Sequence, residues 1–287
     1  MKINRLIALI IIFLIGSTAF GLFNDISIFV FLGHIFILPM VGLWYGFKRK
    51  WQTTSIDLAV YLAFFVGSFS DSIILIGGQI GEGLQIIITI IMHTILIVIF
   101  RKEGTRIYSD KLQDLPKLLI PMTIIFVFFG VFMIPILPNT IYFIAIFYAI
   151  QEMILVSHGL FRKTKGKSYM WVSVGVCLIM VKDILYCYNF FIFNNEFLIL
   201  YIIQYSLSVL VYYLIAVGIA QNQDKMGTKV EASLWQYIKN RIKLLFNFHH
   251  LIVFISLVIK LYKVVISKVK LSIRNFLNFR YVYQPNK

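Results

Sequence analysis

Eight long apolar stretches follow one another along most of this sequence. They run at about 6–24, 26–47, 56–77, 83–100, 118–137, 140–161, 169–190 and 197–220. A helix crosses a hydrocarbon core of ~30 Å with about 20 apolar residues. The chain is 60% hydrophobic and 14% charged, which leaves too little polar surface for a soluble domain. We therefore predict an all-α membrane protein with about eight transmembrane helices over residues 1–220.

The charges between these stretches alternate along the chain. Basic residues gather before the first stretch, after the second, fourth and sixth, and again after the eighth, whereas the other connections carry none. Cytoplasmic loops of membrane proteins have an excess of Lys and Arg. This alternation predicts a multi-pass protein of the cell (plasma) membrane with both ends of the chain on the cytoplasmic side.

The first stretch also has features of a signal peptide. It has a basic start, an apolar run and small residues near Ser17 to Ala19. Cleavage there would leave seven spans and would not change the polarity of the loops. Because the apolar run continues to Phe23, we favour an uncleaved first helix.

Residues 221–287 form a second region with a different composition. They hold 12 Lys or Arg against Asp224 and Glu231, a net charge of +10. Their longest apolar run, Leu251 to Ile259, is too short to cross a membrane. We predict a basic amphipathic helix on the anionic inner-leaflet lipid; a partner-docking helix is the alternative. Because the basic residues lie in loops and in this tail, nucleic-acid binding is not expected.

Three carboxylates lie well inside predicted spans: Asp71, Glu152 and Asp183. A charge at the bilayer centre costs at least ~2.5–3.5 kcal/mol, so each needs a reason. Asp71 and Asp183 are each about 15 residues from the cytoplasmic end of their span and are 112 positions apart. The same offset aligns His93 with Tyr205. This spacing favours two parallel four-helix halves, each placing one carboxylate toward a shared centre.

Other residues bear on this aspartate pair. Ser68 lies one turn before Asp71, and Tyr186 lies three residues after Asp183, to which it could donate. Lys182 either extends outward to the membrane surface or pairs with Asp183 and holds it ionised. A lone intramembrane Asp often serves only a helix–helix hydrogen bond. The matched depths and the polar neighbours favour a functional pair over that alternative.

Three further polar residues are candidates for the same site. His93 is either a proton carrier or a hydrogen-bonded packing residue, and Gln204 and Glu152 are candidates to line the site. The sequence has no cluster of ligands with metal-binding spacing and no Gly-rich phosphate loop. We therefore expect neither a metal nor a cofactor, and the sequence carries no prediction of the oligomeric state.

Two segments resemble signatures of the YhhN family, the lysoplasmalogenase-like membrane proteins. The first signature is an apolar helix ending in Gly-Asp or Ser-Asp, followed by a helix with a central His and a Phe seven residues later. The second is a Gly eight residues before an Asp. The matching residues are Ser70, Asp71, His93 and Phe100 for the first signature and Gly175 and Asp183 for the second.

The resemblance covers most of residues 30–220 and departs from the family pattern at several positions. Pro39-Met40 resembles an early Lys-Pro element of the family, but the Lys of that element is missing. Lys182 stands where the family usually has a Ser, and Leu96 stands where it usually has a Tyr. The basic tail has no counterpart in the family pattern. This chain therefore resembles a divergent member.

The resemblance implies a hydrolase that cleaves the vinyl-ether bond of lysoplasmalogens, a class of membrane lysophospholipid, and releases a fatty aldehyde. Asp71 and Asp183 would then be the acid and the base or stabiliser, with His93 and Tyr205 in support. If Lys182 holds Asp183 ionised, Asp71 is the proton donor. The alternative function is a non-catalytic lipid- or small-molecule-binding sensor or transporter that uses the same cavity.

Overall fold

The computed structural model describes residues 2–24, 26–73, 78–105, 107, 114–138, 141–193 and 197–225. Within these ranges, eight helices are long and apolar enough to cross a membrane. This confirms the predicted all-α membrane fold and its eight spans. The helices are α1 (Lys2–Phe23), α2 (Ser27–Lys48), α3 (Ser55–Ile73), α4 (Gly78–Lys102), α5 (Leu115–Val127), α6 (Tyr142–Leu160), α7 (Lys167–Cys187) and α8 (Leu198–Lys225). Two short π-helical segments, η3 (Phe128–Met133) and η4 (Tyr188–Ile192), continue α5 and α7.

The predicted amphipathic helix of the tail lies outside the described residues. The described part of the tail is residues 221–225, which continue α8. The predicted first span is one continuous helix in the structure, α1.

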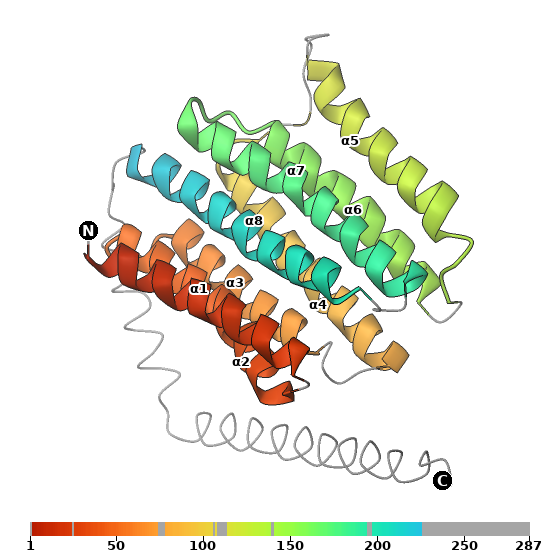
Figure 1. Ribbon diagram of the computed structural model, residues 1–287. Coiled ribbons are helices and arrows are strands. Elements are labelled where there is room, and N and C mark those ends of the chain that lie inside the picture. The colour runs from red at the N-terminus through yellow and green to blue at the C-terminus, as the bar shows by residue number, and fades with distance from the viewer. Residues whose placement is uncertain are drawn as a thin grey trace, which may run out of the picture. The chain divides into compact units, whose positions relative to one another are not determined.

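Six helices pack in a closed circuit. Along this circuit α2 contacts α3, α3 contacts α4, α4 contacts α6, α6 contacts α7, α7 contacts α8, and α8 returns to α2. Helix α1 packs outside the circuit on α2 and α8, and α5 packs outside on α6. Figure 1 shows α5 at one edge of the bundle, away from α1 and α2.

The eight-helix bundle consists of two similar halves, α1–α4 and α5–α8. Helices α2 and α6 end at Lys48 and Leu160, and α3 and α7 begin at Ser55 and Lys167. Lys48 and Leu160 are 112 residues apart, and so are Ser55 and Lys167. This is also the separation between Asp71 and Asp183. The two main contacts between the halves, α4 with α6 and α8 with α2, correspond to one another under this offset. The arrangement is the one predicted from the spacing of the two aspartates.

The start of α3 has a capping box. The Thr54 hydroxyl accepts a hydrogen bond from the backbone N–H of Asp57 at 3.2 Å. In return, the Asp57 carboxylate accepts from the backbone N–H of Thr54 at 3.1 Å. These reciprocal bonds satisfy two N–H groups that the first turn of a helix leaves without partners. They fix the position at which α3 enters the bundle.

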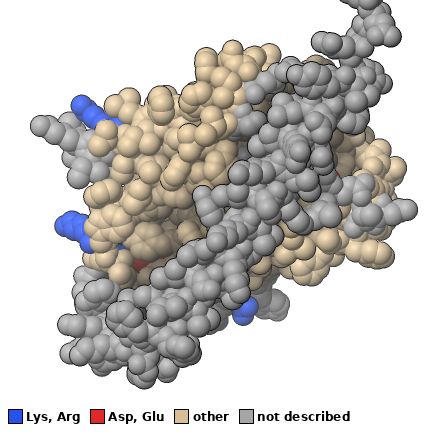
Figure 2. All heavy atoms as spheres, turned by 90° about the horizontal axis from the view of Figure 1, so that it is seen from below, with Lys and Arg blue, Asp and Glu red and all other residues tan. Residues whose placement is uncertain are grey.

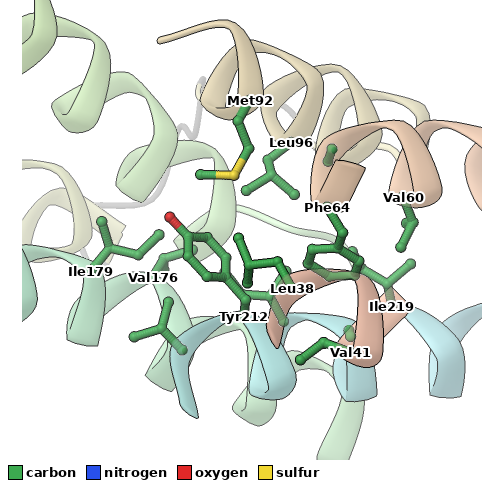
Figure 3. Packing of buried hydrophobic residues seen from close by; sticks show 14 of the residues in the cluster. Leu38, Val41, Val60, Phe64, Met92, Leu96, Val176, Ile179, Tyr212 and Ile219 are labelled. Atoms are coloured by element: carbon green, nitrogen blue, oxygen red, sulfur yellow. The ribbon is translucent and has the colours of Figure 1, made fainter. Parts of the chain in front are cut away.

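The core lies between the two halves. Buried apolar side chains from α2, α3, α4, α7 and α8 converge there (Figure 3). Phe64 of α3 and Tyr212 of α8 meet edge to face, with ring centroids 6.4 Å apart. On the outside, large apolar residues face away from the protein; Phe143 is 82% exposed and Phe126 is 72% exposed. Lys, Arg, Asp and Glu are sparse on the described surface in Figure 2, as a lipid-facing surface requires.

Helix α3 approaches two neighbouring helices closely beside Asp71. A Cβ atom on Gly67 of α3 would lie 2.5 Å from the Met92 sulfur of α4 and 2.7 Å from Leu38 Cδ1 of α2. An alanine at this position would require both of these side chains to shift. Small residues allow such close packing of membrane helices, and here they bring α3 against two neighbours just below the aspartate.

Two ion pairs join the halves at one end of the bundle. We call this the basic end, because it carries Lys48–Lys50, Arg101–Lys102 and Arg162–Lys165. Arg49, after α2, pairs with Asp224 of α8 at 2.6 Å. Arg162, after α6, pairs with Glu103, after α4, at 2.6 Å, and both of these side chains are fully buried. The first pair therefore joins α2 to α8, and the second joins α6 to α4.

We expect Gly218→Ala to destabilise the contact between α7 and α8. An added Cβ would lie 2.9 Å from the backbone oxygen of Ser168 and 3.1 Å from the backbone nitrogen of Val172. Backbone atoms cannot rotate away as a side chain can, so overpacking should cost about 1–3 kcal/mol. Thermal melting in detergent would show this as a lowered midpoint. The control is Gly16→Ala, where nothing lies within 4 Å of the added atom; equal midpoints for both variants would contradict the prediction.

Candidate functional site

A cavity of about 90 Å³ lies between the two halves, with room for several water molecules. Helices α3, α4, α6, α7 and α8 all contribute to its wall. Asp71 and Asp183, one from each half, both line it, as the sequence predicts for a shared centre. The polar wall residues are Asp71, Gln85, Thr89, Tyr148, Lys182, Asp183, Tyr186, Gln204, Ser208 and Tyr212.

Asp183 is held on both oxygens. The Lys182 ammonium lies 2.7 Å from its Oδ1, and the Tyr148 hydroxyl donates to its Oδ2 at 2.6 Å. Lys182 and Asp183 are both buried, so Lys182 does not extend to the membrane surface. The pairing alternative is therefore the one found.

Lys182 also faces the other half of the site. It interacts electrostatically with Asp71 as well as with Asp183, and its ammonium lies over the Tyr212 ring, 5.9 Å from the centroid. Asp71 makes no hydrogen bond or ion pair with any residue that the structure describes. The cavity thus holds one paired carboxylate and one carboxylate without a direct partner, with a single cation acting on both.

His93 and Glu152 are deeply buried beside the cavity and are not part of its wall. His93 is 0% exposed and Glu152 is 2% exposed. The two ring nitrogens of His93 have no hydrogen-bond partner among the described residues. The same holds for the Oε1 atom of Glu152. The His93 ring lies beside the Tyr148 ring, with centroids 5.6 Å apart. Glu152 interacts electrostatically with Asp183 and Lys182.

Gln204 and Tyr186 line the cavity, but the expected bond from Tyr186 to Asp183 is wrong. The Tyr186 hydroxyl donates instead to Gln85 Oε1 of α4, at 3.2 Å. Tyr186 therefore ties α7 to α4, and the donor to Asp183 is Tyr148. The Gln204 Oε1 atom has no hydrogen-bond partner in the described part of the chain, which leaves it free to bind a molecule in the cavity.

Ser68 and Tyr205 lie away from the cavity wall. The Ser68 hydroxyl donates to the backbone oxygen of Phe65 in its own helix, at 2.7 Å. Tyr205 stacks on the His34 ring, with centroids 4.6 Å apart. Neither residue therefore contacts the cavity directly.

Sequence reasoning did not single out His34 of α2. Its Nδ1 atom lies 2.8 Å from the backbone oxygen of Val30, which can only accept, so Nδ1 carries the proton. Its Nε2 atom then accepts from the Tyr201 hydroxyl of α8 at 2.7 Å. A histidine within an apolar run is a usable signal for such a contact. The pair joins α2 to α8, one of the two contacts between the halves.

Comparisons of this chain with protein-family models, with curated proteins and with solved structures find no match.

Proposed function

We propose that this protein is a membrane-embedded hydrolase that cleaves the vinyl-ether bond of a lysoplasmalogen-type lipid through its aspartate pair. One observation carries the proposal: Asp71 and Asp183, at corresponding positions of the two halves, line one cavity. Their surroundings differ, since Lys182 pairs with Asp183 and not with Asp71. Two carboxyl groups in different environments are the usual arrangement for an acid and its partner. The resemblance of both segments to the YhhN family supports the same activity.

The first step is proton transfer to carbon. Asp71, in its protonated form, gives its proton to the double-bond carbon that does not bear oxygen. The π electrons form the new C–H bond, and the carbon that bears oxygen becomes an oxocarbenium ion. Asp183, ionised beside Lys182, stabilises this cation by its negative charge. The unequal partners of the two aspartates assign these roles.

The second step is capture of the cation by water. As the water oxygen bonds to the carbon, its proton passes to a carboxylate of the site, and the hemiacetal so formed collapses to an aldehyde and an alcohol. Lys182 interacts with both aspartates, so it can return a proton from the Asp183 side to Asp71. Substrate and one water then account for all atoms of the products, and Asp71 is again protonated.

The test is aldehyde release by the protein purified in detergent, with three matched lysophospholipids as substrates. The vinyl-ether lipid should release a fatty aldehyde, whereas its saturated alkyl-ether analogue should not, because it has no double bond to protonate. The acyl lipid tests for ordinary esterase activity and should also give no product. Absence of aldehyde from a folded, monodisperse preparation would contradict the proposal.

We also propose an orientation and a lipid contact for the chain. Its excess of basic residues should place the basic end at the cytoplasmic face of the cell membrane. The charged tail beyond residue 225 should then meet the anionic inner leaflet. The eight apolar helices support the membrane location, and the charge pattern of the loops supports the direction.

The second candidate function is a non-catalytic membrane sensor or transporter that binds a lipid or small molecule. It is favoured by the occupied state of Asp183, whose two oxygens already accept from Lys182 and Tyr148. It is also favoured by the small cavity of about 90 Å³. A lipid that stays bound through purification and is unchanged in mass would support this function over hydrolysis.

A further inference from the structure

His93 and Glu152 lack the partners that buried polar groups normally have. Both are nearly inaccessible, at 0% and 2% exposure, and the atoms noted above have no hydrogen-bond partner among the described residues. Leaving such a group unsatisfied destabilises the folded state, and more so if the group is charged. Neither residue has a part in the proposed hydrolysis, so their burial needs another reason.

Tyr148 connects these two residues to the cavity. Its hydroxyl donates to Asp183 in the cavity wall at 2.6 Å. Its ring packs beside His93, with centroids 5.6 Å apart. Glu152 follows Tyr148 by four residues on α6 and so lies one turn further along the same face. A tyrosine hydroxyl both donates and accepts, which lets it pass a proton between its neighbours.

These groups lie at successive depths in the bundle. At 1.5 Å per helical residue, counted from the basic end of each helix, Asp183 lies about 24 Å deep, Tyr148 about 18 Å, His93 about 14 Å and Glu152 about 12 Å. Ser157 follows on α6 at about 5 Å. Ser157 is 1% exposed, and its hydroxyl has no hydrogen-bond partner in the described ranges. Polar groups without protein partners therefore continue from the cavity toward the basic end.

We propose that Tyr148, His93 and Glu152 form a proton route, completed by internal water, that connects the cavity with the basic end of the bundle. Each step moves one proton from one oxygen or nitrogen atom to the next and needs no other reactant. Buried water between polar groups is a normal part of protein structure, and intramembrane carboxylates and histidines commonly mark proton relays. The route does not depend on the hydrolase activity.

Charged and titratable groups face Glu152 from the neighbouring helices. On α7 they are Lys182, Asp183 and Cys187, which all interact with it electrostatically. On α6 itself Tyr148 interacts electrostatically with Glu152, and the His93 ring of α4 lies beside the Tyr148 ring. The described part of α5 contributes Lys117 alone, near the basic end.

The test is proton flux through the full-length protein in liposomes. A potassium gradient with valinomycin supplies the voltage, and a trapped pH dye reports protons that enter. The wild type should take up protons at least about tenfold faster than protein-free liposomes. Glu152→Gln and His93→Phe should both fall to the protein-free rate. The matched control, Glu82→Gln, removes a carboxylate at the other end of α4 and should retain the wild-type rate.

A second measurement covers variants that fail to fold. A carbodiimide that modifies buried carboxyl groups should stop the flux of the wild type and add its mass to the peptide that contains Glu152. Aldehyde release is measured on the same preparations, so loss of flux with intact hydrolysis separates the two proposals. The route is overturned if wild-type liposomes match protein-free liposomes, or if a folded Glu152→Gln keeps the full flux.

Discussion

Replacing Asp71 by asparagine is expected to lower the rate of aldehyde release by about 10²–10⁴-fold, the usual contribution of a general acid. The amide keeps the size of the side chain but cannot give a proton to carbon. Because Asp71 makes no hydrogen bond or ion pair with the described residues, the change should leave the fold intact. The loss should therefore appear in kcat at unchanged KM. Initial rates over a range of lipid concentrations would measure both constants.

Two further variants are compared with Asp71→Asn in this experiment. Asp183→Asn should also lose activity, and it should in addition lower the melting temperature, because it leaves the buried Lys182 ammonium without its carboxylate. Ser72→Ala is the control beside Asp71: its hydroxyl donates to the backbone oxygen of Ser68 at 2.7 Å, away from the reaction. Full activity in purified Asp71→Asn would remove Asp71 from the mechanism.

The membrane architecture could be predicted from the sequence because its causes are local. The length of each apolar run is fixed by the thickness of the bilayer, and the eight helices of the structure match the eight runs. The shared position of Asp71 and Asp183 could also be predicted. The spacing along the sequence puts Asp71 and Asp183 at equal depth on α3 and α7, which are corresponding helices of the two halves. In the structure both residues line one cavity.

The partners of these residues could not be predicted, because they depend on how each helix is rotated about its axis. Tyr148 lies 35 residues before Asp183 in the sequence, yet its hydroxyl donates to that carboxylate. Tyr186 is three residues from Asp183 but points to Gln85 of another helix. Likewise, spacing left both orientations of Lys182 open, and the structure places its ammonium inside the bundle, 2.7 Å from Asp183 Oδ1.

The charged residues between the spans have a second role that composition does not show. Counting them gives the predicted orientation, but the count treats Arg49 and Arg162 as equivalent loop charges. In the structure Arg49 follows α2 and pairs with Asp224 of the other half. Arg162 follows α6 and pairs with Glu103 of the other half. Asn222 of α8 also donates to Glu103, at 2.8 Å. The same end of α8 thus contacts both ion pairs and leads directly into the basic tail.

Removing one partner of the buried Arg162–Glu103 pair is expected to give a large loss of stability. Glu103→Gln or Arg162→Met should each lower the free energy of unfolding by about 3–5 kcal/mol, because each leaves the other charge buried without its counter-ion. Burial lowers the pKa of Arg162, but a guanidinium stays protonated in proteins, so it cannot escape this cost by losing its proton. Thermal and SDS-titrated unfolding in detergent would measure the loss.

The double variant Glu103→Leu with Arg162→Met decides how the loss arises. If each single loss reflects an unpaired buried charge, the double variant should recover most of the stability, since apolar residues often replace a buried ion pair at little cost. Lys163→Met is the matched control: it removes an adjacent positive charge that is exposed, and it should change stability by less than about 0.5 kcal/mol. Additive losses in the double variant would mean that the two residues act separately. Recovery would show that the pair acts as one contact between the halves, so that any opening between them must occur at the end away from the basic residues.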